Sequence, residues 1–427
     1  MKLIKAAMWD RMQYIFRAYY DRMMHACFYY DGTLDALALK EAFTILVTKI
    51  PILRSRYIAN PAIPYWKVTE HVNADNFFTF VEVEDSDEAA DNFLCTSIPV
   101  KSDYQLRALL VRCGGKDTLC IIINHMCFDG ADFKYFNKKL AECYNNIVSK
   151  NLHTVDVKAG TRSAAQVYAS MNKKDRIAAK KLFRNASAVK ARAGFPFEPP
   201  SGKDAQTIIK HKLFVPIIKL KAAGKAQDAT VNDIILAAYC RALYSITERD
   251  ASEPLSIACM VNLRRHIASG DTKGLTNLTS LFMCEISSRG KDIFKTVELV
   301  KAALHAVKRD KFIGLYGPPL IKLAFSIFPA ALAEACIKLG YNNPLIGMSN
   351  IGIIEDEAHS MGGVRLRDAF MTGAIKFKPY MQLALTTFRD EITFTVAQKA
   401  SPKDCNKIKR LLELIDAELL EYIKGSN

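Results

Sequence analysis

The order of strand and helix signals constrains the fold most, because one mixed order appears twice along the chain. In the first run, extended stretches such as residues 106–113 alternate with segments whose apolar residues recur at helical spacing. The alternation restarts at residue 207 and continues to a closing helix over residues 402–423. Two such runs predict an α/β protein with two similar halves, each a mixed sheet covered by helices.

The stretch GFPFEPPSGKD lies between the two runs, and its Pro and Gly residues make it the best boundary in the chain. We therefore expect an N-terminal subdomain over residues 1–160, a connector over 161–204 and a C-terminal subdomain over 205–427. The connector holds a basic helical stretch, residues 172–194, with eight Lys or Arg and one acid. Its simplest interpretation is a solvated helix surface, and an anion site is the alternative.

Several local signals predict individual elements. Strands 106–113 and 118–124 form a hairpin around a Gly-Gly-Lys turn, and Thr230 caps a long apolar helix. Either Thr33 or Asp35 caps an earlier helix, and PILRSRYIA after it has extended character. The apolar region 318–341 is interrupted by Lys322, Pro329 and Glu334, which favours a buried or lid-like helix pair over a membrane span.

Charge and cysteine usage limit the possible partners. The 59 Lys and Arg exceed the 44 Asp and Glu and give a net charge of +15, which favours anionic partners. No aromatic residues alternate with the basic ones, so nucleic acid is not expected. The eleven cysteines form no CxxC pair, and the first sixteen residues make a poor signal peptide. We expect a cytoplasmic protein without stable membrane insertion, as a monomer or weak oligomer.

A polar motif ends the most apolar strand of the first run. The run Ile121–Ile123 continues into NHMCFDG, which places His125 at the strand end and Asp129 within one tight turn of it. A neutral imidazole on a rigid strand end is suited to accept a proton from a hydroxyl or an amine. Gly130 allows a sharp bend or the close approach of a substrate. The alternative is a histidine that is simply buried in the core.

Two other chemistries fit the same residues less well. His125, Cys127 and Asp129 occupy alternate positions and would share one face of a straight strand, as metal ligands do. Gly130 indicates that the strand ends here, and no other His or Cys cluster is near in sequence, so no metal is expected. A nucleophilic Cys127–His125 pair is weaker still, because residues two apart in a bending loop rarely meet.

The motif and four further segments resemble the chloramphenicol acetyltransferase-like superfamily. This group includes condensation domains, alcohol acetyltransferases and polyketide-associated acyltransferases, and its signature is HHxxxDG. Segments similar to the family follow in the expected order: GTLDALALKEAFTILVTKIPILRSRY, TVNDIILAAYCRAL, MVNLRRH with GLTNLTSLF, and GMSNIGII. The resemblance therefore spans nearly the full length of the chain.

The resemblance implies a pseudo-dimer of two such subdomains with an active-site tunnel between them. His125 would act as the general base that deprotonates an alcohol or amine acceptor as it attacks an acyl thioester. Asp129 would form the catalytic pair with His125, but it would point away from the substrate and pair with an arginine. Arg54 matches that role best and Arg264 is second. Ser349 and Asn350 would line the tunnel or hold the oxyanion.

The resemblance also predicts the co-substrates, and this chain departs from the family signature at one position. The acyl donor would be acyl-coenzyme A or the acyl-phosphopantetheine of an acidic carrier protein, with no permanently bound cofactor. Asn124 replaces the first His of the signature, which changes the local hydrogen bonding. The Asp-Phe-Gly-Trp-Gly motif of the plant branch is missing, which disfavours that subgroup. A non-catalytic docking protein of a biosynthetic complex is the main alternative function, and a metal-dependent hydrolase is the third.

Overall fold

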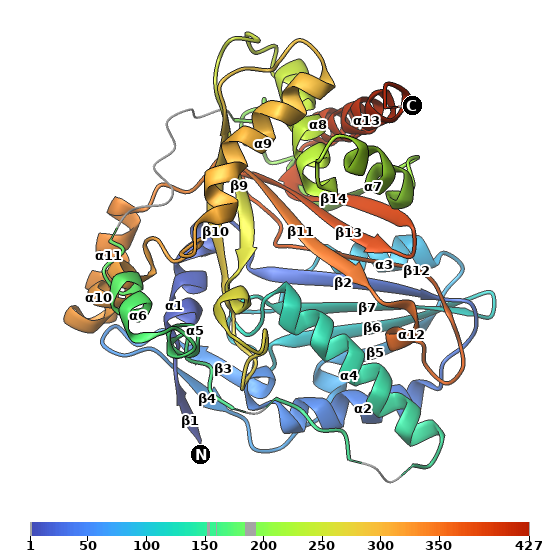
Figure 1. Ribbon diagram of the computed structural model, residues 1–427. Helices are drawn as coiled ribbons and strands as arrows, with labels where there is room; N and C mark the ends of the chain where they lie inside the picture. The colour runs from blue at the N-terminus through green and yellow to red at the C-terminus, as the bar shows by residue number, and fades with distance from the viewer. Residues whose placement is uncertain (1, 152–153, 159, 184–193, 427) are drawn as a thin grey trace.

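The computed structural model describes residues 2–151, 154–158, 160–183 and 194–426. Their strands form a five-stranded, a six-stranded and a small three-stranded sheet (Figure 1). The five-stranded sheet has the order β12-β2-β7-β6-β5, and it is built from β12 (Leu366–Thr372), β2 (Met23–Tyr30), β7 (Lys116–Asn124), β6 (Leu106–Cys113) and β5 (Phe78–Glu82). β5 and β6 pair in parallel and the other pairs are antiparallel, so the sheet is mixed, as predicted.

Helices cover both faces of this sheet, which explains the apolar run before the motif. On one face, Ile121 and Ile123 pack among residues of α2 (Ala36–Lys49) and α4 (Gly130–Val148). On the other, Cys120 and Ile122 pack against α3 (Ser86–Leu94). Because successive strand residues point to opposite faces, a strand covered on both sides must be apolar throughout.

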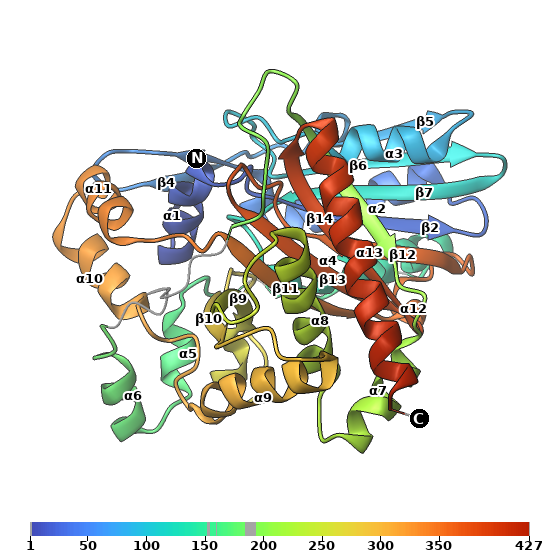
Figure 2. The ribbon, with the colours of Figure 1, turned by 90° about the horizontal axis from the view of Figure 1, so that it is seen from above.

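The six-stranded sheet carries the second run of strands and helices. Its order is β10-β9-β11-β13-β14-β8, from β10 (Thr279–Ile286), β9 (Leu255–Asn262), β11 (Ile346–Ile354), β13 (Met381–Phe388), β14 (Glu391–Ala400) and β8 (Ala205–Lys212). The helices packed on it are α7 (Ile217–Ala226), α8 (Val231–Ile246), α9 (Ile293–Arg309) and α13 (Pro402–Lys424). Figure 2 shows α13 crossing this sheet beside β14. The two mixed sheets with their helices confirm the predicted architecture.

One strand crosses between the halves. β12 follows β11 in the chain, yet it pairs with β2 of the first sheet, with Phe370 opposite Cys27. β8 and β14 in turn contribute Ile208 and Ala397 to the apolar cluster on the α3 face of that sheet. This exchange joins the two halves through a shared strand as well as through packing.

The small sheet and a group of short helices lie beside the two large sheets. The sheet has the order β1-β4-β3, from β1 (Leu3–Lys5), β4 (Tyr65–Val68) and β3 (Ser55–Ile58). The helices are α1 (Met8–Ile15), α5 (Ala165–Ala169), α6 (Lys173–Ala179), α10 (Pro318–Ile327), α11 (Ala330–Gly340) and the separate α12 (Asp356–His359), with the 3₁₀ turns η1 (Phe16–Ala18), η2 (Pro51–Arg54), η3 (Ala74–Asn76) and η4 (Leu263–His266). In the described part of the chain, no helix has the length and hydropathy that crossing a membrane requires.

The local predictions are mostly confirmed. The hairpin forms at 106–124, Thr230 and Asp35 cap their helices, and α10 and α11 form the helix pair around Pro329. The extended prediction for PILRSRYIA is wrong at its start, because Pro51–Arg54 forms a 3₁₀ turn with Pro at its first position before β3 begins. Of the basic stretch, α6 is described, while residues 184–193 lie outside the described residues.

Candidate functional site

The motif forms a tight turn between the end of β7 and the start of α4. The His125 N–H donates to the Arg22 carbonyl at 2.7 Å, and the Cys127 N–H donates to the Asn124 carbonyl at 2.8 Å. Asp129 is the N-cap of α4, and its Oδ1 accepts the N–H groups of Ala131 and Asp132, both at 3.1 Å. These bonds satisfy backbone groups that a chain reversal would leave unpaired.

Asn124, the departure from the family signature, is a buried residue that braces the turn. Its Nδ2 donates to Gln105 Oε1 at 2.8 Å, and its Oδ1 accepts the Met126 N–H at 3.0 Å. Gln105 is itself held, because its Nε2 donates to the Ser55 carbonyl at 2.8 Å. Both polar atoms of the Asn124 side chain are therefore bonded within the N-terminal half.

The His125 imidazole is fixed through Nδ1. Nδ1 lies 2.9 Å from the Phe128 carbonyl oxygen and 3.0 Å from Asn277 Nδ2. The carbonyl can only accept a hydrogen bond, and Asn277 Nδ2 has an acceptor of its own in the His125 carbonyl at 3.1 Å. The tautomer with the proton on Nδ1 satisfies all of these groups, and it leaves Nε2 unprotonated.

Burial keeps this imidazole neutral. Desolvation lowers the pKa of His125 below its ordinary value of 6.5, and the nearby Lys376 ammonium lowers it further. The His125 and Phe128 carbonyls and the Asp129 carboxylate oppose this shift. A neutral imidazole with a fixed tautomer is the form that accepts a proton at neutral pH.

Asp129 faces away from the imidazole, as the family resemblance implied. Its Oδ2 accepts from Arg264 Nη1 at 2.6 Å and from the Leu278 N–H at 2.7 Å, and the residue is buried. Arg264 also pairs with Asp132 Oδ1 at 2.9 Å and donates to the Thr276 carbonyl. Both Asp129 oxygens accept hydrogen bonds from donors other than the imidazole. Asp129 is therefore a positioning residue, and the prediction that it is catalytic together with His125 is corrected.

The prediction that Arg54 pairs with Asp129 is wrong. Arg54 ends the 3₁₀ turn η2 and donates instead to the carbonyls of Thr69 and Glu70, beside the small sheet. Arg264, the second choice, takes the role because η4 follows β9 and brings the guanidinium across from the C-terminal half. The pair therefore ties the two halves together at the motif.

The sequence prediction missed Arg162, which holds the same turn from the connector. Its guanidinium donates to the carbonyls of Met126 (3.1 Å), Cys127 (2.8 Å) and Leu275 (2.8 Å). It also pairs with the buried Asp10 of α1 at 2.7 Å. The three carbonyls that Arg162 binds come together only when the chain folds. In the sequence, Arg162 is one of many basic residues, and nothing near it indicates this role.

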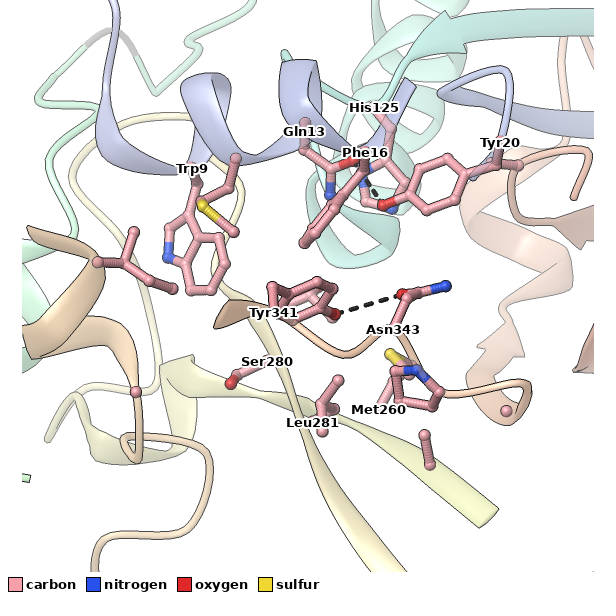
Figure 3. A pocket seen from close by; sticks show the side chains of 18 of the residues that line it. Trp9, Gln13, Phe16, Tyr20, His125, Met260, Ser280, Leu281, Tyr341 and Asn343 are labelled. Carbon is pink, nitrogen blue, oxygen red and sulfur yellow. Dashed lines mark hydrogen bonds between the residues drawn. The ribbon is translucent and has the colours of Figure 1, made fainter. Parts of the chain in front are cut away.

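His125 lies at the wall of a cavity of about 590 Å³ between the two halves. Figure 3 shows Gln13, Phe16 and Tyr20 on the same side of the cavity as His125, with residues of β9 and β10 opposite. Most of the lining is apolar or aromatic, including both helices of the pair around Pro329. An apolar cavity with few polar groups is typical of a small-molecule site.

The remaining predicted residues divide between this cavity and other places. Gly130 and Ser349 line the cavity. A Cβ on Gly130 would come no closer than 3.7 Å to Ile351, and the Gly130 backbone lies in the first turn of α4. Gly130 therefore leaves room at the cavity wall, and the backbone makes no unusual bend there. Asn350 does not line the cavity; it is exposed and bonds Asn232 Oδ1 at 2.7 Å.

Neither the metal nor the cysteine chemistry gains support. The described residues contain no group of His, Cys, Asp and Glu side chains arranged to hold a metal ion. Cys127 is buried, and burial raises the pKa of its thiol well above the ordinary value of 9.0. A thiol in that state is a core residue rather than a nucleophile.

A second cavity, of about 1010 Å³, adjoins the first, and Pro318 and Leu323 line both. Its described lining contains no Asp or Glu. It contains eight basic residues: Lys2, Lys5, Lys49, Lys158, Arg162, Arg176, Lys180 and Lys322. Lys158 and Arg162 pair with acids outside the cavity, and Lys49 donates to the Val155 carbonyl. The other five have no ion pair with any described residue. Such a cavity attracts anions.

Comparisons with known proteins agree with this geometry. A sequence model of the condensation domain matches residues 11–316. A comparison with curated protein sequences gives no match. Among solved structures, the SgcC5 protein from Streptomyces globisporus is similar with a TM-score of 0.70 at 11% identity, covering 97% of this chain and 98% of that one.

Two further structures are similar over the whole length. The first condensation domain of the CDA synthetase has a TM-score of 0.68 at 14% identity, covering 98% of this chain and 96% of that chain. Polyketide synthase associated protein 5 from Mycobacterium tuberculosis has a TM-score of 0.64 at 15% identity, covering 98% of each chain. At such low identity these likenesses establish the pseudo-dimeric, chloramphenicol acetyltransferase-like fold alone.

Proposed function

Because the chain belongs to the condensation-domain family, we propose that it is an acyltransferase with His125 as the general base. Members of this family typically transfer acyl or peptidyl groups. The proposed reaction moves an acyl group from a thioester to a hydroxyl or amine. The observation that carries it is the fixed, neutral imidazole of His125 at the wall of the cavity between the halves.

The chemistry follows from the protonation state of that imidazole. Nε2 accepts the proton of the acceptor O–H or N–H while the acceptor atom attacks the thioester carbonyl carbon. The new bond gives a tetrahedral oxyanion, which collapses as the carbon–sulfur bond breaks. The departing thiolate takes the proton from the imidazolium, so His125 returns to its starting state and the products are a free thiol and an ester or amide.

The oxyanion needs a hydrogen-bond donor inside the cavity. Of the two residues proposed from the sequence, Ser349 remains the candidate, because it lines the cavity and its hydroxyl has no partner among the described residues. Asn350 is removed from this role by its contact with Asn232. One donor to an oxyanion typically contributes about 10²–10³-fold in rate.

The basic cavity supports a phosphate-bearing donor, and we favour coenzyme A over a carrier protein. Five Lys or Arg of this lining have no ion pair with a described residue, and the lining adjoins the reaction cavity, so they suit the phosphates of coenzyme A. An acidic carrier protein would instead be attracted to the outside of this basic cavity, and its phosphopantetheine would bring the thioester to the same position. The acceptor is a small alcohol or amine that fits about 590 Å³.

The docking alternative rested on Asn124. The Asn124 side chain stabilises the turn through hydrogen bonds of both its nitrogen and its oxygen. An asparagine at this position is therefore compatible with catalysis by His125. The cytoplasmic location and the monomeric or weakly oligomeric state stay predictions, as does the lack of a permanent cofactor.

An acyl-transfer assay tests the proposal. The protein is incubated with acetyl- and longer acyl-coenzyme A and a mixture of alcohols and amines, and free thiol and the ester or amide products are measured. We expect thiol release that depends on an acceptor. Binding of an acidic acyl carrier protein with no turnover of any thioester would favour the docking function instead.

The donor site has its own test. In the double variant Lys180→Glu/Lys322→Glu the basic cavity loses two cations and gains two acids. We expect KM for acyl-coenzyme A to rise about tenfold or more, with KM for the corresponding acyl-N-acetylcysteamine unchanged, because that thioester has no phosphate. Equal effects on both donors would place the phosphates elsewhere.

A further inference from the structure

The apolar cavity beside His125 contains one lysine, and its surroundings carry an inference beyond the proposed transfer. Lys376 is the sole Lys or Arg among the described residues that line this cavity, and no described Asp or Glu lines it. Its Nζ lies 3.8 Å from the centre of the Tyr20 ring. The structure gives it no ion pair within the described part of the chain.

The position of Lys376 is set by a rigid backbone. Its N–H donates to the Ala397 carbonyl at 2.9 Å, and its carbonyl accepts the Lys399 N–H at 2.8 Å. A bridge to Tyr20 holds the same residue from the N-terminal half. The side chain therefore starts from a backbone segment fixed on both sides, and its Nζ lies over the Tyr20 ring at the cavity wall.

Asp21, the acid whose field acts on Lys376, forms no ion pair with it among the described residues. Asp21 acts on Lys376 only through its field, because its Oδ1 accepts the N–H groups of Met23 and Ile375 and its Oδ2 accepts the Ser97 hydroxyl. Burial lowers the pKa of Lys376 to about 7, and the Tyr20 ring offsets only part of the desolvation. An ammonium in this state is stabilised by any anion that enters the cavity.

A second unused donor lies beside the hydroxyl of the same Tyr20. Gln13 is 6% exposed, and its Oε1 accepts the Tyr20 hydroxyl at 3.1 Å. Its Nε2 has no acceptor among the described residues, although the side chain lines the cavity. Figure 3 shows Gln13 and Tyr20 next to His125. Because Gln13 lines the cavity, this amide donor is open to a ligand or a water there.

We propose that Lys376 and the Gln13 amide bind a carboxylate of the substrate, so that this enzyme acts on an acidic molecule. The inference rests on the proposed function, and it names the substrate class of that same cavity. The carboxylate has two possible sources with the same chemistry. It belongs either to the acceptor, as in a hydroxy or amino acid, or to the acyl group of the donor, as in the monothioester of a dicarboxylic acid.

Paired substrates separate the two sources. In the acceptor arm, hydroxy and amino acids of increasing chain length are compared with their methyl esters, using acetyl-coenzyme A. In the donor arm, succinyl- and glutaryl-coenzyme A are compared with pentanoyl-coenzyme A, using neutral alcohols. Lys376→Met should raise KM for the acidic member of one arm about 10- to 100-fold, the loss expected for a charged hydrogen bond, and leave its neutral partner within about twofold.

Three further variants distinguish recognition from a structural effect. Lys376→Arg should restore much of the preference for the acid, and Gln13→Leu should weaken it to a smaller extent. Lys399→Met makes the same substitution on an exposed residue of β14, and it should change neither member of a pair. If Lys376→Met slows acidic and neutral substrates equally, or if no acid is preferred in either arm, the carboxylate site is refuted.

Binding without turnover keeps this test separate from the proposed function. Titration calorimetry with the same acids and esters measures affinity in the absence of a donor. Tighter binding of an acid than of its ester in the wild type, lost in Lys376→Met, supports the site even if no acyl transfer is found. Turnover of neutral substrates with no acid binding at all would refute the site and leave the acyltransferase intact.

Discussion

The turn between β7 and α4 has two sides that differ in how their polar groups are satisfied. On the interior side, Asn124 and Asp129 have every side-chain oxygen and nitrogen bonded, to Gln105, Arg264 and backbone N–H groups. On the cavity side, the structure gives His125 Nε2 no partner among the described residues, although Nδ1 is held. The difference separates two tasks within seven residues: the interior side holds the geometry, and the cavity side leaves one basic atom free for a ligand.

We therefore expect substitutions on the two sides of the turn to affect different quantities. A change on the interior side should appear in the free energy of unfolding, and a change on the cavity side in the rate.

The largest effect is expected for His125→Ala. Loss of a general base should lower kcat/KM for acyl transfer about 10²–10⁴-fold, since the acceptor then attacks with its proton in place. The free energy of unfolding, measured in urea, should fall by only about 1 kcal/mol, because the Phe128 carbonyl is the hydrogen-bond acceptor that loses its partner. His305→Ala, on the exposed face of α9, is the control and should change neither quantity. A His125→Ala variant as fast as the wild type would remove the general base.

Arg264→Met tests the interior side. The substitution leaves Asp129 and Asp132 buried with no guanidinium between them, and breaking a buried pair of this kind costs about 3–5 kcal/mol. The urea midpoint should fall accordingly. Arg265→Met changes the exposed neighbour in the same turn and should stay within about 0.5 kcal/mol of the wild type. If the two variants are equally stable, the network does not hold the turn.

The same contrast explains which parts of the site the sequence predicts. Periodicity and caps are local, so the hairpin before His125 and the helix capped by Thr230 follow directly from neighbouring residues. The family resemblance assigned an arginine to Asp129, but the choice between Arg54 and Arg264 depends on a contact across 135 positions. Nothing in the residues around Arg54 shows that its guanidinium is taken by the Thr69 carbonyl.

Non-local pairing also limits the prediction of the fold. The two runs of strands and helices predict two mixed sheets, which form. The pairing of β12 with β2 joins residues more than 300 positions apart, and an apolar alternating segment has no feature that selects its partner strand. Arg162 is a similar case, because its role depends on carbonyls that meet only after the connector has folded against the motif.

Asn124→Ala should have a smaller effect on stability. The substitution leaves Gln105 Oε1 and the Met126 N–H without their partner in a buried place, which costs about 1–3 kcal/mol. The value of kcat should stay within about fivefold of the wild type, because the side chain does not face the cavity. A loss of activity comparable to that of His125→Ala, at unchanged stability, would move Asn124 to the catalytic side of the turn.

A change of pH perturbs both sides of the turn least. We expect it to change the rate through His125 and the stability through Asp132, in opposite directions. On the cavity side, kcat/KM should fall as the pH drops through the pKa of His125, which burial places below 6.5. On the interior side, burial and the neighbouring Asp129 raise the pKa of Asp132 to about 7. Because this folded-state pKa exceeds the unfolded value of about 3.9, the contribution of Asp132 to stability is complete below that value and is lost as the pH rises towards 7.

Rate and stability therefore change in opposite directions over the same pH range, and Asp132→Asn separates them. The variant keeps an acceptor for the Thr276 N–H, which Asp132 Oδ2 binds at 2.6 Å, but it has no carboxyl to titrate. Its unfolding free energy should depend less on pH between about 4 and 7 than that of the wild type, while the acid limb of kcat/KM stays in place. An acid limb that moves with Asp132→Asn would mean that the rate follows the buried carboxyl rather than the imidazole, and the division between the two sides of the turn would fail.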